Sequence, residues 1–173
     1  MPARAELDYF RTFGRYNQWA NQRLYAACAT LPEGEYLKPR PSFFGSIHTT
    51  LNHVLVGDRL WLSRLTGHLA THIKALDQIL YPEFTGLRVA REAEDAAIIN
   101  YVNGLDEPTL NSTLRYKNME GETLAWPVRQ VLGHLFNHQT HHRGQTHGLL
   151  SQTSVSPPPL DLLHYLREAA PAG

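Results

Sequence analysis

The sequence concentrates imidazole side chains, which bind divalent metal ions through nitrogen, in one short segment. Ten of the 173 residues are histidines, and four of them fall within nine positions: His134, His138, His141 and His142. At about 100° per residue, positions 134, 138 and 141 project within about 60° of one another on a helix, with position 142 beside 138. Histidines four residues apart can share one metal ion. The segment predicts a metal-binding helix face, and spacing leaves the choice among the four histidines open.

A third ligand has to come from another segment, and His53 is the strongest candidate. It is a polar residue in the apolar middle of a predicted helix, between Leu51 and Val54. The alternative is a buried histidine that makes one hydrogen bond and binds nothing. His48, five residues earlier, points to a different side of the helix and is the weaker candidate.

Other metal-binding patterns are missing from the sequence. No Glu stands three residues before a His, as di-iron bundles require, and the His-Glu-x-x-His motif of zinc proteases is absent. The single cysteine, Cys28, can form neither a cysteine-rich zinc site nor an internal disulfide. A mononuclear site of three histidines remains, and an open fourth position is typical of catalytic zinc. Such a site can activate water for hydrolysis or a thiol for transfer.

Four long helices are predicted to position these residues. Apolar residues recurring at three- and four-residue steps indicate helices from Leu7 to about Ala29, between a Ser46 cap and Gly67, from Leu87 to about Val102 with Gly104 at its end, and from Pro127 at the first helical position towards Ser151. Prolines make residues 31–42 a loop. Residues 68–86 are expected to be mostly loop, with a short helical turn before Pro82.

Two smaller elements complete the predicted fold. Residues 114–116 and 123–125 flank a turn that contains glycine, which predicts a short hairpin. Residues 160–166 follow three prolines and are expected to form a terminal helix on the bundle. The expected fold class is therefore all-α, a four-helix bundle with a short hairpin before the fourth long helix and a short C-terminal helix. One domain over residues 1–173 is expected.

Composition argues against two classes of partner. Sixteen basic and sixteen acidic residues leave no net charge and form no long run of one sign, so a nucleic-acid partner is not expected. No segment approaches the roughly 20 apolar residues that span a bilayer, and the first residues lack an apolar signal core. We therefore expect a soluble, cytoplasmic protein with no membrane partner.

Several segments closely resemble the DinB (YfiT-like) family of metal-dependent enzymes. They are YNQWAN at 16–21, GSIHTTLNHVL at 45–55, DRLWL at 58–62, HLFNH at 134–138, HHRGQ at 141–145 and LDLLHYL at 160–166. The resemblance covers nearly the whole chain, with the motifs in the family's order. It implies an up-down-down-up four-helix bundle, a homodimer, and a metal ion held by His53, His138 and His142. His134 and His141 then become neighbouring or packing residues, and Gln145 a polar neighbour.

The resemblance also frames the expected function. Related proteins use small thiols such as bacillithiol or mycothiol in transfer reactions, and others have been regarded as hydrolase-like. We therefore expect a transferase or hydrolase that acts on a small molecule, with zinc or nickel as the divalent ion. The alternative is a metal-binding stress-response protein without turnover. No catalytic acid or base is identified, because Asp58 and Arg143 are expected to be structural partners.

Overall fold

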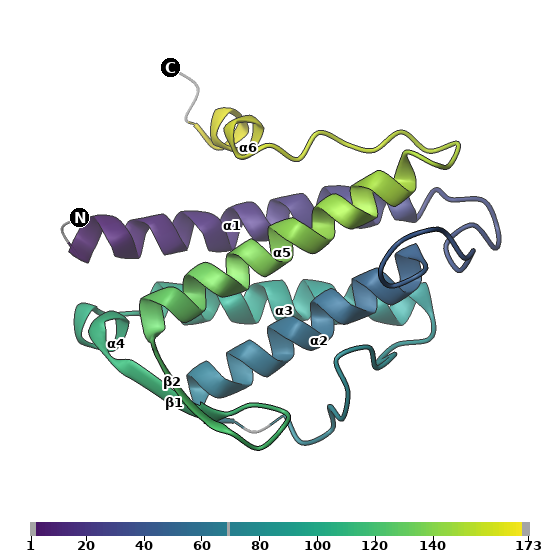
Figure 1. Ribbon diagram of the computed structural model, residues 1–173. Helices are drawn as coiled ribbons and strands as arrows, with labels where there is room; N and C mark the ends of the chain where they lie inside the picture. The colour runs from purple at the N-terminus through teal and green to yellow at the C-terminus, as the bar shows by residue number, and fades with distance from the viewer. Residues whose placement is uncertain (1–2, 69, 171–173) are drawn as a thin grey trace.

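The computed structural model describes residues 3–68 and 70–170, which form six helices and one two-stranded sheet (Figure 1). The elements are α1 (Ala3–Cys28), α2 (Ile47–Thr66), α3 (Phe84–Gly104), α4 (Glu107–Asn111), β1 (Thr113–Lys117), β2 (Thr123–Pro127), α5 (Val128–Leu150) and α6 (Leu162–Ala169). The protein is thus mostly helical with a small antiparallel hairpin before its last long helix, as expected. None of the described helices is both long and apolar enough to cross a membrane.

The four long helices α1, α2, α3 and α5 pack against one another. α2 runs along α5 and α1 runs along α3, while contacts of α1 with α5 and of α2 with α3 join the two pairs. Figure 1 shows α6 lying beyond α1 and α5, and the hairpin lying beside one end of α2. α2 and α5 are therefore neighbours along their lengths, which is the condition for uniting His53 with the cluster on α5.

The core has a polar middle between two apolar ends. One apolar cluster contains Leu24, Leu51 and Leu150, and the other contains Phe10, Ile98 and Leu132. Between them on every long helix lie buried polar residues, which are Asn17 and Asn21 on α1, Asp58 on α2, Arg91 and Asp95 on α3, and Gln139 and Arg143 on α5. Apolar burial at both ends thus stabilises helices that have to carry a polar layer between them.

The predicted ends of α2 are confirmed by its capping contacts. The Ser46 hydroxyl accepts a hydrogen bond from the Thr49 backbone N–H, and the Thr49 hydroxyl accepts one from the Ser46 N–H, which makes a reciprocal capping box. Gly67 ends the helix in the left-handed backbone conformation, with φ of 75°, which residues other than glycine adopt only at an energetic cost. These two residues fix the span on which His53 lies.

Several predicted boundaries were wrong. α3 begins at Phe84, three residues before the predicted start, and the short helical turn expected before Pro82 is absent from the described loop. Pro127 ends β2 instead of opening α5, because the Val128 N–H bonds to the Ser112 carbonyl. The short helix α4 was not predicted at all. Its N-cap, Asp106, accepts a hydrogen bond from the Thr109 N–H.

Candidate metal centre

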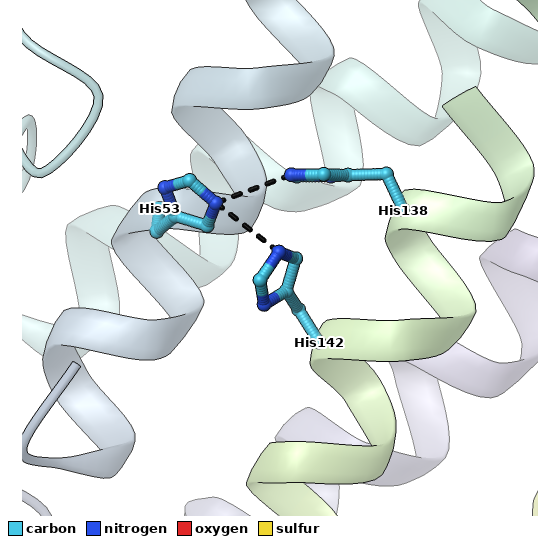
Figure 2. Close-up of side chains that lie close together, drawn as sticks. All are labelled: His53, His138 and His142. Atoms are coloured by element: carbon cyan, nitrogen blue, oxygen red, sulfur yellow. Dashed lines mark hydrogen bonds between the residues drawn. The ribbon is translucent and has the colours of Figure 1, made fainter. Parts of the chain in front are cut away.

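The structure brings three histidines together between α2 and α5. His53 lies on α2, and His138 and His142 lie one turn apart on α5, with all three side chains pointing toward one another (Figure 2). The His53 Nε2 atom lies 3.1 Å from His138 Nε2 and 3.2 Å from His142 Nε2. One nitrogen from each residue falls within 4.8 Å of the others, so the group could hold a metal ion.

The partners of the other ring nitrogens show that this group suits a cation. His53 Nδ1 lies 2.7 Å from the Leu76 carbonyl oxygen, which only accepts, so the hydrogen of the neutral ring is on Nδ1 and Nε2 carries a lone pair. His142 Nδ1 likewise lies 2.8 Å from Gln145 Oε1, and its Nε2 is left with a lone pair. Two lone pairs facing each other at 3.2 Å repel unless a cation lies between them. The residues present therefore fit a divalent metal ion.

His138 is placed by a glycine. A Cβ atom added at Gly57 would come within 2.6 Å of the His138 Cε1 atom, so the imidazole ring lies directly against the α2 backbone. Gly57 lies one turn after His53 on the same helix. It was not identified from the sequence, although glycine in the interior of a helix is destabilising. His138 Nδ1 is buried without a hydrogen-bond partner in the described chain.

Burial keeps the three imidazoles neutral. It lowers the pKa of His53, His138 and His142 below the ordinary value, since a buried cation loses its hydration. The pKa of His138 falls to about 3, first through burial and then through the neighbouring His142 and His53 rings. At neutral pH all three rings are therefore in the unprotonated form that binds metal.

Aromatic side chains enclose the group on one side. The Phe44 ring stacks on His53 with centroids 4.1 Å apart and meets His142 edge-on at 5.5 Å. The adjacent Phe43 is 86% exposed and contacts Phe44. Phe44 thus limits the access of water to two of the three histidines.

The remaining candidate histidines lie outside the group. The His134 ring packs edge-on against Trp61 at 4.9 Å and is 5.8 Å from the His138 ring. His141 Nε2 accepts a hydrogen bond from the Gln145 side-chain amide, and the His141 ring meets His142 edge-on with centroids 4.7 Å apart. His48 is buried against Tyr36, away from the three. These positions agree with the neighbouring and packing roles expected for His134 and His141.

Asp58 and Arg143 belong to the buried polar layer, as expected. The Arg91 Nη1 atom donates to Asp58 Oδ2 at 2.5 Å, and the Gln139 amide donates to the same oxygen. Arg143 donates to Gln139 Oε1 at 3.2 Å and to the Asn17 side-chain oxygen. Burial raises the pKa of Asp58 to about 7. Gln139 and Arg143 each follow a histidine of the group directly, so the polar layer holds an adjacent side of the same α5 turns.

Comparison with known proteins identifies the family of this chain. The model of the DinB family matches residues 1–172. Protein DinB of Bacillus subtilis (strain 168) is 31% identical over 163 residues, which cover 92% of this chain and 94% of the relative. Given the match along the whole chain, together with the three converging histidines on its second and last long helices, the chain belongs to the DinB family.

Proposed function

We propose that this protein is a metal-dependent enzyme that acts on a small molecule, as a transferase of small thiols or as a hydrolase. The observation that carries the proposal is the convergence of three neutral imidazole nitrogens with two lone pairs directed at one point. Three protein donors are one fewer than zinc takes, which is the arrangement of catalytic sites. When bound, the ion supplies Lewis acidity that favours deprotonation of a water or thiol.

The residues of this chain have distinct parts in the proposed site. His53, His138 and His142 hold the ion through Nε2. The Leu76 carbonyl and the Gln145 amide orient His53 and His142, because each accepts the hydrogen on Nδ1. Phe44 excludes water from the face of His53 on which it stacks. The proposed ion is zinc or nickel, since imidazole suits both.

We further propose the bundle order and the assembly that the family resemblance implies. From its N-terminal to its C-terminal end, each of α1 and α5 passes first through the apolar cluster that contains Phe10 and then through the cluster that contains Leu24. Along α2 and α3 the order of the two clusters is reversed. This reversal supports an up-down-down-up bundle. A homodimer in the cytoplasm is the proposed working form.

Turnover by metal-loaded protein tests the catalytic proposal. Protein reconstituted with zinc or with nickel is incubated with small thiols plus an electrophile, and separately with simple esters and amides. We expect conversion in one of these series that disappears in His53→Ala and remains in His72→Ala, which changes an exposed loop histidine. Absence of conversion in both series with fully loaded protein would count against an enzyme.

A second candidate is a metal-binding protein without turnover, acting in a stress response. It is favoured by one observation: the three histidines join two different helices, so an ion between them would stabilise the fold whether or not it reacts. A large increase of the melting temperature with metal, without conversion of any substrate series, would support this candidate over the enzyme.

A further inference from the structure

A cavity lies between the hairpin and the helices that carry the histidine group. Its volume is about 360 Å³, within the range of small-molecule sites. Six residues line it, which are Trp61 from α2, Tyr116 and Trp126 from the hairpin, and Gln130, Val131 and His134 from the start of α5. None of these six carries a formal charge, so the cavity suits a neutral, flat group.

Three large aromatic side chains form the walls of this aromatic cavity. The Trp61 and Tyr116 rings meet edge-on at 5.4 Å, and the Arg64 guanidinium lies 4.6 Å from each of them. Two walls are therefore held in place before any ligand arrives. Trp126 pairs across the hairpin with Leu114, which packs on the apolar core, yet Trp126 is 50% exposed. An aromatic ring turned toward the helices and still half exposed indicates room for a ligand beside it.

The aromatic cavity is contiguous with the histidine group through one residue. His134 lines the cavity, and its ring contacts Trp61 at 4.9 Å on one side and approaches the His138 ring at 5.8 Å on the other. His134 is one helical turn before His138 on α5. The side chains of Trp61, His134 and His138 therefore form a continuous row from the cavity to the proposed metal ion. A small molecule whose ring fills the cavity can extend along this row.

Polar groups at the cavity wall can select substituents on such a ring. Among the residues that the structure describes, the Gln130 side-chain amide and the Tyr116 hydroxyl form no hydrogen bond within the protein. Both are free to bond a hydroxyl or carbonyl group, as is typical of largely apolar pockets with few polar anchors.

We propose that the aromatic cavity binds an aromatic ring of the substrate and places the reactive group of that molecule toward His53, His138 and His142. The assignment of the ring to a substrate rests on the proposed function of the histidine group. Binding of an aromatic ring in the cavity does not depend on it, so the two can fail separately.

Indole signals in nuclear magnetic resonance spectra test the binding itself. Metal-free, nitrogen-15-labelled protein is titrated with 2-naphthol. The Trp61 and Trp126 indole N–H signals should shift in a saturable manner. Trp19 is an internal control, because its indole N–H donates to Glu168 at 2.8 Å, outside the cavity, and its signal should not move. Equal shifts of all three signals, or none, would overturn the proposal.

Two matched variants locate the binding. Trp126→Ala should weaken 2-naphthol binding about threefold to tenfold, which is the usual contribution of one aromatic contact to affinity. Leu163→Ala removes a side chain that is 66% exposed on α6 and should leave the affinity unchanged. Similar losses in both variants would contradict the assignment. Shifts of Trp61 and Trp126 on concentrating the protein alone would place a second copy in the cavity and overturn it too.

A pair of chelating probes tests the link to the histidine group. With zinc-loaded protein, phenylacetohydroxamate should bind about threefold to tenfold more tightly than acetohydroxamate, and Trp126→Ala should abolish this gain. A gain that persists in Trp126→Ala would overturn the cavity as a substrate site. If the protein takes up neither zinc nor nickel, the proposed function fails and the 2-naphthol titration alone decides whether the cavity binds aromatic rings.

Discussion

At the scale of single residues, the histidine group depends on neighbours that carry no metal-binding chemistry of their own. Gly57 gives the His138 ring its space, and the Leu76 carbonyl and Gln145 amide set which nitrogen of His53 and His142 carries hydrogen. Gly57 and Gln145 can each be changed without removing a ligand, whereas the Leu76 carbonyl belongs to the backbone. These substitutions therefore test the geometry of the site apart from its composition.

Gly57→Ala should weaken metal binding by at least about tenfold, because the new Cβ atom displaces the His138 ring. Alanine otherwise favours a helix over glycine by about 1 kcal/mol, so a general loss of folding is not the expected cause. Competition with a chelating dye measures the affinity. Gly148→Ala on α5 is the control, since nothing lies within 4 Å of its added Cβ atom. Unchanged affinity in Gly57→Ala would show that the ring is placed otherwise.

Gln145→Ala should lower metal affinity about tenfold to a hundredfold, since it removes the acceptor that orients His142. Gln145→Glu keeps an acceptor at the same position and should restore most of the affinity. The same dye competition compares the two variants. Equal losses in Gln145→Ala and Gln145→Glu would mean that the Nδ1 contact does not matter.

At the scale of elements, the polar layer ties the four long helices together at the level of the site. Arg91 on α3 bonds Asp58 on α2 and forms an ion pair with Asp95 at 3.0 Å. Asp95 in turn accepts hydrogen bonds from Asn21 at 2.9 Å and from Asn17 at 3.4 Å, both on α1. The polar layer thereby determines how α5 faces α2.

Arg91→Met should destabilise the metal-free protein by about 3–5 kcal/mol, because it leaves buried carboxylates without their cation. Urea unfolding followed by circular dichroism measures the change. Arg88→Met on the same helix breaks an exposed ion pair with Glu92 and should cost less than about 1 kcal/mol. Similar costs for the two variants would refute a structural role for the polar layer.

The helices and strands were predicted from the sequence more accurately than the side-chain contacts between them. The apolar spacing, Ser46 and Gly67 were enough to predict α2, and the glycine turn was enough to predict the hairpin. α4 escaped prediction because five residues are too few for a periodic pattern to show. The start of α3 escaped because its N-cap, Glu83, makes no side-chain capping bond.

The candidate site was predictable only in part for a similar reason. Spacing on α5 proposed four histidines, and the family resemblance selected two of them together with His53. The Leu76 carbonyl was beyond prediction, because it lies in an irregular loop, 23 residues from the His53 ring it orients. Gly57 is visible in the sequence as a glycine one turn after His53. Its role depends on how closely α5 approaches α2, which the sequence does not show.

At the scale of the whole molecule, the histidine group couples stability to pH. The pKa of His138 is about 3 in the folded protein against an ordinary 6.5, so protons bind the unfolded chain better. The stabilisation from the neutral ring is fully present above pH 6.5 and is lost as the pH falls toward 3. His53 and His142 act in the same direction.

Metal-free protein should therefore lose about 1–2 kcal/mol of unfolding free energy between pH 7 and pH 5 through His138 alone. Urea unfolding at the two pH values measures the loss. His138→Gln, whose side chain does not titrate in this range, should reduce the difference by that amount. A pH dependence that is the same in His138→Gln as in the wild type would contradict the buried neutral ring.

The proposed site holds one divalent ion between His53, His138 and His142. Elemental analysis of protein purified without an affinity tag measures that ion. We expect about one zinc or nickel ion per chain in the wild type and in His134→Ala, and almost none in His138→Ala, because only the latter removes one of the three converging nitrogens. A wild type without metal, or a His138→Ala variant that keeps its ion while His134→Ala loses it, would contradict the claim.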